Sequence, residues 1–371
     1  MPMLCRSPLA PDFRHSARKL LPASPEDASW PTHQAPIRLG LLVPFQGADA
    51  IWGPSCQYSA VLAAAELNRN GGILGRQVEL FAVDAGGDPQ RVVTRAWELV
   101  EEHSIDALIG VHLSSVRLAL REAFAGVVPY IFAPLYEGGE RTRGVFAIGD
   151  TPERQFPAAV NWLMNNRGAQ RWFLVGNDYI WPRASHAAVR RIVGQAHGSI
   201  VGEEYIGLGQ ENIASVIEKI AQLKPDIIFE SLVGSDCVMF NRAFSRAGLS
   251  RHIDRLSGAI EENTLLGIGA RHTQNLYCAA SYFSTLNTAT NRNFMAQYRA
   301  AFGANAPIQG VLSHSCYDAI HFFSTLADGA GSVHMAALCD AFERSQGVHQ
   351  PAPIYLAKAQ QMSFEILQQL N

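Results

Sequence analysis

The amino-acid sequence predicts an α/β protein of two Rossmann-like lobes, each with a parallel-sheet core, joined by more than one crossover. Apolar runs alternate with segments of 3.6-residue periodicity, and turns rich in Gly, Ser and Asp separate them, a pattern typical of βαβ units. The alternation restarts after about residue 152, and from about residue 284 only helical segments are expected. The 371 residues suffice for two domains of about 100 to 150 residues each.

The first lobe is predicted from residues 37–152 together with about 284–335. Its strands are expected at IRLGLLVPF (37–45), QVELFAVDA (77–85), DALIGV (106–111) and VVPYIFA (127–133). Between them lie helical patterns, of which the first ends at two glycines, as helix C-termini commonly do.

The second lobe is predicted from residues 153–283 together with about 336–371. Its strands include RWFLVG (171–176) and DIIFESL (226–232), each followed by a helical pattern. Residues 1–36 are expected to form a flexible leader, because they hold several prolines and charges and no continuous apolar stretch of about 7 to 15 residues. We therefore expect a cytoplasmic protein, or a periplasmic one if the true start lies upstream.

Composition narrows the function classes. Hydrophobic residues make up 48% and charged residues 17% of the chain, and the net charge is −3, which fits a globular protein. No Lys/Arg cluster favours direct nucleic-acid binding, and no stretch of about 20 apolar residues predicts a membrane span. The six cysteines show no CxxC or zinc-type spacing, and we expect them to be buried, reduced thiols.

The turns that follow the predicted strands are the candidate binding residues, because ligands of open parallel sheets bind beyond the carboxyl ends of the strands. In the first lobe, His112, Ser114 and Ser115 follow one strand, where the serines can cap a helix or hold a ligand oxygen. Pro134, Tyr136 and Glu137 follow the next strand, in a glycine-containing turn.

In the second lobe, Tyr179 and Trp181 follow RWFLVG, and Gly234 follows DIIFESL. Two residues apart, the aromatic side chains would face the same side of an extended loop and form a wall. Gly234 would permit close approach of the backbone. These loops would face one cleft if the lobes close on each other.

Catalytic and cofactor sites have little support. The chain has no P-loop and no GxSxG, and the nearest GxGxxG, GIGARH, lacks its third glycine and a strand-turn-helix context. The histidines show no HxH or HExxH pattern, so we expect no metal, no cofactor and no catalytic residue. A hydrolase using His112, Ser114 and Glu137 stays as a third hypothesis.

Six stretches carry a family resemblance: GGILGRQVEL, DAGGDPQR, LIGVHLSSVRLAL, PLYEGG, GNDYIWPR and YFST. Together they resemble type I periplasmic-type solute-binding proteins, and within these the branch of cytoplasmic amide sensors of amidase operons and urea-binding proteins of ABC transporters. The resemblance implies that Ser114 and neighbouring helix N–H groups bind the ligand. It also implies that Tyr179 and Trp181 close over the ligand and that Tyr136 and Glu137 line or brace the pocket. Three positions depart from the amide sensors, which have tyrosine at His112, threonine at Pro134 and tyrosine at Trp181.

The resulting function prediction is a non-enzymatic sensor that closes on a small amide-like solute and regulates amidase-type genes, with an antiterminator-type protein as the implied partner. The alternative is a solute-binding protein that delivers urea, short-chain amides or branched-chain amino acids to an ABC permease. HLSS also resembles the loop in which branched-chain amino-acid binders receive a carboxylate. Self-association is compatible with the resemblance, and the C-terminal segment is expected to end the second lobe differently from other family members.

Overall fold

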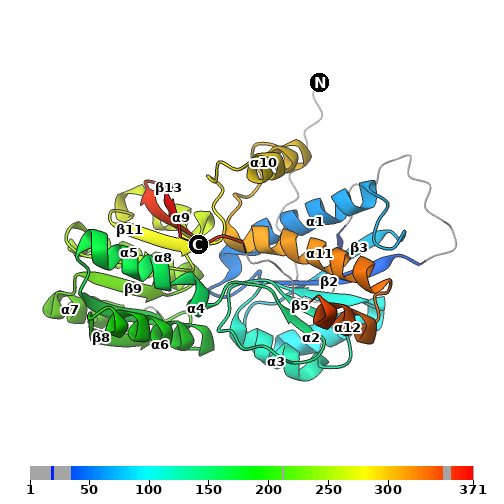
Figure 1. Cartoon of the computed structure of the whole chain (residues 1–371), viewed down its shortest axis with the longest axis horizontal. Coiled ribbons are helices and arrows are strands. Elements are labelled where there is room, and N and C mark those ends of the chain that lie inside the picture. The colour runs from blue at the N-terminus through cyan, green and yellow to red at the C-terminus, as the bar shows by residue number, and fades with distance from the viewer. Residues whose placement is uncertain (1–17, 21–34, 211–212, 346–351, 371) are drawn as a thin grey trace.

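The computed structural model describes residues 18–20, 35–210, 213–345 and 352–370. They form two α/β lobes that lie side by side along the long axis of the molecule (Figure 1). Each lobe has its own mostly parallel sheet covered by helices. The predicted fold class is confirmed.

The first sheet has the strand order β1-β3-β2-β4-β5-β6. Strands β2 to β6 run parallel, so each connection between neighbours needs a crossover, and helices supply most of them. The elements of this part are β2 (Ile37–Val43), α1 (Gly53–Arg69), β3 (Val78–Asp84), α2 (Pro89–His103), β4 (Ala107–Gly110), α3 (Ser114–Phe124), β5 (Tyr130–Phe132) and β6 (Val145–Ala147).

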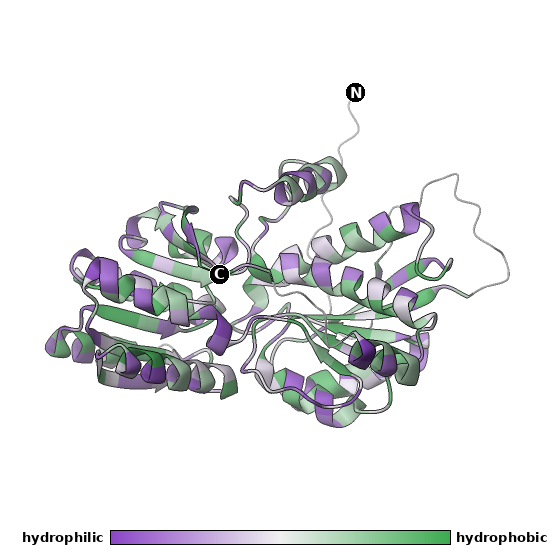
Figure 2. Cartoon of the chain, in the orientation of Figure 1, coloured by the Kyte–Doolittle hydropathy of each residue, from purple (hydrophilic) through white to green (hydrophobic). Residues whose placement is uncertain are grey.

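Strand β2 shows why this sheet is buried on both faces. Leu39 and Leu41 pack into the cluster on the side of α1, whereas Leu42 packs into the cluster formed with α2 and α3. Successive side chains of a strand point to opposite faces, so a nearly continuous apolar run is needed where helices cover both. In Figure 2 the strands are accordingly mostly hydrophobic, and the helices around them carry both kinds of residue.

The second sheet has the order β13-β12-β11-β10-β9-β7-β8. Strands β7 to β11 are parallel and β12 and β13 are antiparallel additions at one edge. The elements are α4 (Pro152–Gln155), α5 (Pro157–Arg167), β7 (Arg171–Asn177), α6 (Ile180–Gln195), β8 (Ser199–Ile206), α7 (Ala214–Leu223), β9 (Ile227–Ser231), α8 (Gly234–Arg246), β10 (Asp254–Ser257), α9 (Glu262–Ile268), β11 (Leu276–Ala280), β12 (Tyr355–Gln360) and β13 (Ser363–Gln369).

After β11 the chain forms α10 (Ala289–Phe302) and then returns to the first lobe with α11 (Val311–Ala330), which packs along α1 (Figure 1). Helix α12 (Met335–Arg344) follows α11, and its Phe342 contacts Phe146 of β6. The expected boundary near residue 336 therefore differs from the packing, because α12 covers the first sheet and only β12 and β13 join the second. The strands of this hairpin were not predicted, since only helices were expected after residue 284.

The leader also differs in part from its prediction. Residues Arg18–Leu20 form β1, which pairs antiparallel with Leu80–Ala82 of β3 at the edge of the first sheet. The rest of the predicted leader, apart from residues 35 and 36, lies outside the described residues. Cys5 lies there too, and the other five cysteines are free and buried. Across the described ranges, no helix combines the length and apolar character that a bilayer span requires.

Candidate functional site

A cavity of about 330 Å³ lies between the two lobes. Several of its residues come from turns at the carboxyl ends of parallel strands in both sheets, the position at which open α/β sheets bind ligands. The lining residues are Trp52, His112, Leu113, Ser114, Pro134, Leu135, Tyr179, Val233, Ala259 and Leu312.

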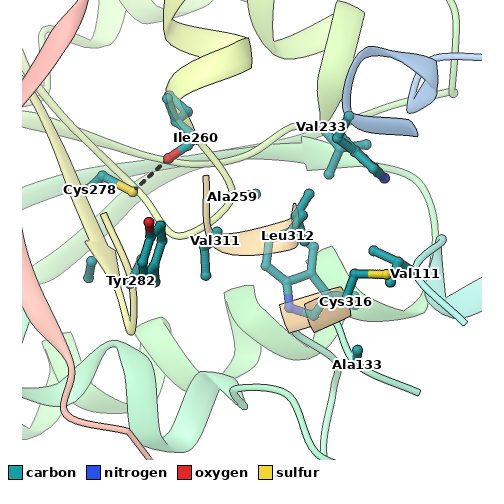
Figure 3. Close-up of a cluster of buried hydrophobic side chains, with 14 of the residues drawn as sticks. Val111, Ala133, Val233, Ala259, Ile260, Cys278, Tyr282, Val311, Leu312 and Cys316 are labelled. Atoms are coloured by element: carbon teal, nitrogen blue, oxygen red, sulfur yellow. Dashed lines mark hydrogen bonds between the residues drawn. The ribbon is translucent and has the colours of Figure 1, made fainter. Parts of the chain in front are cut away.

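Apolar side chains from both lobes meet at this point. Figure 3 shows Val233 and Ala259 of the second lobe facing Val111 and Ala133 of the first, with Leu312 at the start of α11 between them. All five are buried. Water is therefore excluded from much of the wall, which strengthens the few polar contacts available to a ligand.

Ser114 is the first residue of α3, and the residue before it, Leu113, has an extended backbone and provides no side-chain cap. The Ser114 side chain is buried, and its hydroxyl has no hydrogen-bond partner among the described residues. A helix N-terminus carries unpaired N–H groups and positive potential, which favour an anionic or carbonyl oxygen. Ser115 is half-buried and does not line the cavity.

His112 lines the cavity as a neutral ring. Burial lowers the pKa of its imidazole to about 4. Its Nδ1 lies 3.1 Å from the Leu113 carbonyl oxygen, which makes Nδ1 the protonated nitrogen, and its Nε2 lies 3.1 Å from the Tyr130 hydroxyl, which donates to it. Both nitrogens are thereby occupied, so His112 offers the cavity an uncharged surface instead of a base.

The first-lobe loop that carries Trp52 adds further polar groups. Trp52 lines the cavity, is buried, and has an indole N–H without a partner among the described residues. Nearby, Asp49 is 2% exposed and one of its carboxylate oxygens is likewise unpartnered. Burial raises the pKa of Asp49 to about 7. The sequence analysis missed Trp52, although it too lies near the end of a strand, β2, in a turn before a helix.

The residues predicted for the site in the turn after β5 have two different roles. Pro134 lines the cavity, together with Leu135, which was not predicted. Tyr136 packs edge-on against Phe132, and Glu137 forms an ion pair with the buried guanidinium of Arg117. Tyr136 and Glu137 thus do not line the cavity, and they brace the loop that does.

Tyr179 and Trp181 do not form a shared wall. Helix α6 begins at Ile180, so Tyr179 is its extended N-cap and Trp181 belongs to the first turn, where a spacing of two residues no longer places side chains on one side. Tyr179 lines the cavity and is half-buried. Trp181 is 1% exposed and packs into the core, with its ring centroid 6.5 Å from that of Tyr179.

Gly234 makes an interlobe contact and does not line the cavity. Its φ is +50°, and an added Cβ would lie 1.8 Å from the carbonyl oxygen of Ala48 in the first lobe. The predicted close backbone approach is therefore present, but toward the opposite lobe. Val233, directly before it, lines the cavity.

The side chain of Asn177 links two segments of the second lobe by hydrogen bonds. Its side-chain oxygen accepts from the Val233 N–H at 2.9 Å, and its amide nitrogen donates to Asp236 at 2.7 Å. This ties the end of β7, next to Tyr179, to the start of α8. Two of the three cavity-lining segments of the second lobe, those that carry Tyr179 and Val233, are thus joined by hydrogen bonds.

Of the nine residues predicted for the site, four share the cavity: His112, Ser114, Pro134 and Tyr179. Ser115, Tyr136, Glu137, Trp181 and Gly234 lie outside it. Leu312 and Ala259 carry no sequence signal of a site. In the described ranges, no cluster of three or more His, Cys, Asp or Glu side chains is arranged to hold a metal ion.

Two α/β lobes around a small, partly polar cavity at their strand ends define a two-lobed ligand-binding protein. A family model described as periplasmic binding protein matches residues 36–361. The chain belongs to this periplasmic binding protein family.

Among curated proteins, the chain is similar to the Leu/Ile/Val-binding protein BraC3 of Rhizobium johnstonii, with 24% identity over 54% of this chain and 55% of that protein. It is also similar to Leu/Ile/Val-binding protein homolog 3 of Brucella melitensis, with 20% identity over 87% of this chain and 86% of that protein.

Among solved structures, a branched-chain amino acid transporter substrate-binding protein, LivJ of Streptococcus pneumoniae in complex with isoleucine, has a TM-score of 0.78 at 18% identity, covering 90% of this chain and 99% of that one. A solute-binding protein of an ABC transporter from R. palustris in complex with benzoate has a TM-score of 0.77 at 18% identity, covering 91% and 96%. At these identities the structures show a shared fold.

Proposed function

We propose that this chain binds a small solute, with a carboxylate or carbonyl head group and an apolar body, in the interlobe cavity, and serves as the solute-binding component of an ABC-type transporter. The observation that carries the proposal is the buried, unpartnered hydroxyl of Ser114 at the N-terminus of α3. A buried hydroxyl without a partner costs about 1 to 3 kcal/mol, and a bound oxygen atom removes that cost.

The rest of the cavity fits the same solute. The indole N–H of Trp52 is a second unpartnered donor, and neutral His112 places no charge beside the head group. Leu135, Val233 and Leu312 form an apolar wall for an aliphatic or aromatic body. Since no group in this cavity wall acts as a free base, we propose binding without catalysis.

The names of the similar proteins and the ligands of the similar structures support a role in transport better than a role as an amide sensor. The similar proteins are described as Leu/Ile/Val-binding proteins, and the similar structures contain isoleucine or benzoate. Both are carboxylates with apolar bodies. A permease is then the partner class, and we propose a periplasmic location in place of the expected cytoplasmic one, to be tested by cell fractionation.

The test is a binding panel with purified protein, read by tryptophan fluorescence and by the unfolding midpoint. The panel contains leucine, isoleucine, benzoate, butyramide and urea. A ligand that binds only the folded state at about 100 times its Kd stabilises the protein by about 2.7 kcal/mol. We expect a shift with leucine, isoleucine or benzoate. A shift with butyramide or urea and none with any carboxylate would overturn the proposal in favour of amide sensing, and ammonia release from butyramide would show a hydrolase.

A further inference from the structure

A second cavity, of about 520 Å³, adjoins the first. The two share Pro134, Leu135 and Leu312 in their walls. The second cavity lies where the chain passes between the lobes, because its wall also includes Gly149, after β6, and Ser281, after β11. The two cavities therefore meet at the three residues that they share, and a solute held at Ser114 lies next to the second cavity.

Gln155 provides the wall of this second cavity with an unsatisfied acceptor. Its side chain is 1% exposed, and its amide nitrogen donates to the carbonyl oxygens of Gly258 at 2.8 Å and Ala279 at 2.6 Å. Two carbonyl partners fix the orientation of the amide, since an amide oxygen cannot bond to either of them. The remaining atom, Oε1, is buried and has no partner among the described residues. An N–H or O–H donor on a bound solute would remove the cost of this unpartnered oxygen.

The charges on this wall also favour a donor. Val311, Ser315 and Asp318 lie on one face of α11, at spacings of four and three residues, and all three line the cavity. The Asp318 carboxylate lies 3.0 Å from Nδ1 of His314, and 43% of the Asp318 side chain is exposed. On the opposite side, Asp150 forms an ion pair with Arg154.

Two carboxylates thus face one guanidinium in this wall, and the neighbouring acceptor, Gln155 Oε1, adds partial negative charge. A carboxylate in the ligand would be repelled by this arrangement, whereas an ammonium or amide N–H group would find acceptors. The polarity of the second cavity is therefore opposite to that of the first, where Ser114 and Trp52 offer donors.

We propose that the second cavity is a subsite for an N–H donor, an ammonium or amide group, at the distal end of the solute whose carboxylate or carbonyl head lies at Ser114. This inference rests on the proposed function and narrows it to solutes with an acceptor head group at one end of an aliphatic chain and an N–H donor at the other. The substrate class is then an amino acid or carboxylic acid with a terminal amine or amide.

Norleucine and lysine are the matched probes, because lysine is the same carbon chain with an ammonium group at its end. Titration calorimetry at pH 8, where the free lysine side chain, with a pKa of about 10.4, is charged, gives both Kd values. Wild-type protein should bind lysine about tenfold tighter than norleucine. Asp318→Asn should reduce that ratio about threefold, the size of a partly exposed charge interaction. Asp328→Asn, an exposed acid on the same helix that does not line the cavity, should leave the ratio unchanged.

The outcomes separate the two proposals. Norleucine binding equal to or tighter than lysine binding would show that the second cavity holds water only, and overturns this inference while the proposed function stands. A ratio that Asp318→Asn does not change would also overturn it. Ser114→Ala should weaken both probes by the same factor, because it removes the contact with the head group they share. Binding of neither probe and of no other carboxylate would overturn the proposed function and this inference with it.

Discussion

Ser235 of the second lobe donates its backbone N–H to the carbonyl oxygen of Ala48 in the first lobe, at 2.8 Å. Ala48 lies in the loop after β2, and Ser235 lies in the first turn of α8, which follows β9. Gly234 makes the contact sterically feasible, since any Cβ at that position would overlap the Ala48 oxygen. This backbone hydrogen bond ties the two lobes together.

Gly234→Ala should therefore oppose closure. The added Cβ would meet backbone and not a flexible side chain, so the lobes must separate to relieve the overlap. We expect the Kd for the solute to rise by about tenfold or more and the radius of gyration with saturating ligand to stay at its ligand-free value. Gly248→Ala is the control, because Gly248 also has a positive φ, +76°, with open space around it. Equal affinities for the two variants would show that the loop contact does not govern closure.

Ser114→Ala should weaken binding by about 1 to 3 kcal/mol, or about 5- to 150-fold in Kd, without lowering the unfolding midpoint of the ligand-free protein. The hydroxyl has no partner in the protein, so the ligand-free state loses no hydrogen bond. Ser115→Ala, one residue along the same helix and outside the cavity, should change the Kd by less than about twofold. Calorimetric titration of both variants measures the two Kd values. An equal loss of affinity in both variants would show that Ser114 does not contact the ligand.

Trp181→Ala and Tyr179→Ala should separate stability from binding. Trp181 is buried in the core, and its truncation should cost about 3 to 5 kcal/mol of unfolding free energy. Tyr179 is half-buried and lines the cavity, so Tyr179→Ala should cost less stability and raise the Kd more. Urea unfolding and ligand titration on both proteins measure the two effects. A Trp181→Ala protein with unchanged stability would contradict its placement in the core.

Stability should depend on pH through Glu261, whose carboxylate is buried and accepts from the Leu312 N–H at 3.1 Å. Burial raises the pKa of Glu261 from 4.5 to about 7. Between these values the folded state binds more protons than the unfolded state, so this group stabilises the fold at low pH and its contribution falls as pH rises from 4.5 to 7. Glu261→Gln should remove that fall.

The measurement is the unfolding free energy of wild type and Glu261→Gln at intervals from pH 4.5 to 7.5. Their difference matters, because His112 acts in the opposite direction: its pKa is lowered to about 4, so its contribution grows with pH up to about 6.5. This contribution is common to both proteins and cancels. Glu218→Gln, an exposed substitution in α7, is the control and should give a difference independent of pH. The same flat difference for Glu261→Gln would show that Glu261 titrates normally.

Alternating apolar and helical segments predict most of this fold, because strands buried on both faces need uninterrupted apolar runs. Leu39, Leu41 and Leu42 illustrate the rule. The hairpin of β12 and β13 was missed because it lacks such an apolar run. It lies at a sheet edge, β13 is largely exposed, and its residues are too polar to produce a strand signal. Strand β1 is only three residues long and pairs at the other sheet's edge.

The candidate site could be predicted where a residue follows a strand directly, as Ser114 does. Trp181 was misplaced because the start of α6 decides which way the side chain points, and the sequence allowed either an extended loop or a helix there. Leu312 reaches the cavity from α11, far from the cavity loops in sequence. Only the three-dimensional return of the chain brings it there, and no local pattern signals such a return.

The last two strands have a consequence for how the protein is made. On the ribosome, β11 emerges long before its neighbour β12, since α10, α11 and α12 are synthesised between them. During that interval the newly made second lobe exposes an unpaired strand edge, which is a template for pairing with other chains. In the first lobe, α1 likewise lacks its packing partner until α11 has been synthesised. Neither lobe can finish folding while its chain is still short, so nascent chains stalled in this interval should be the species that chaperones recognise and that aggregates recruit.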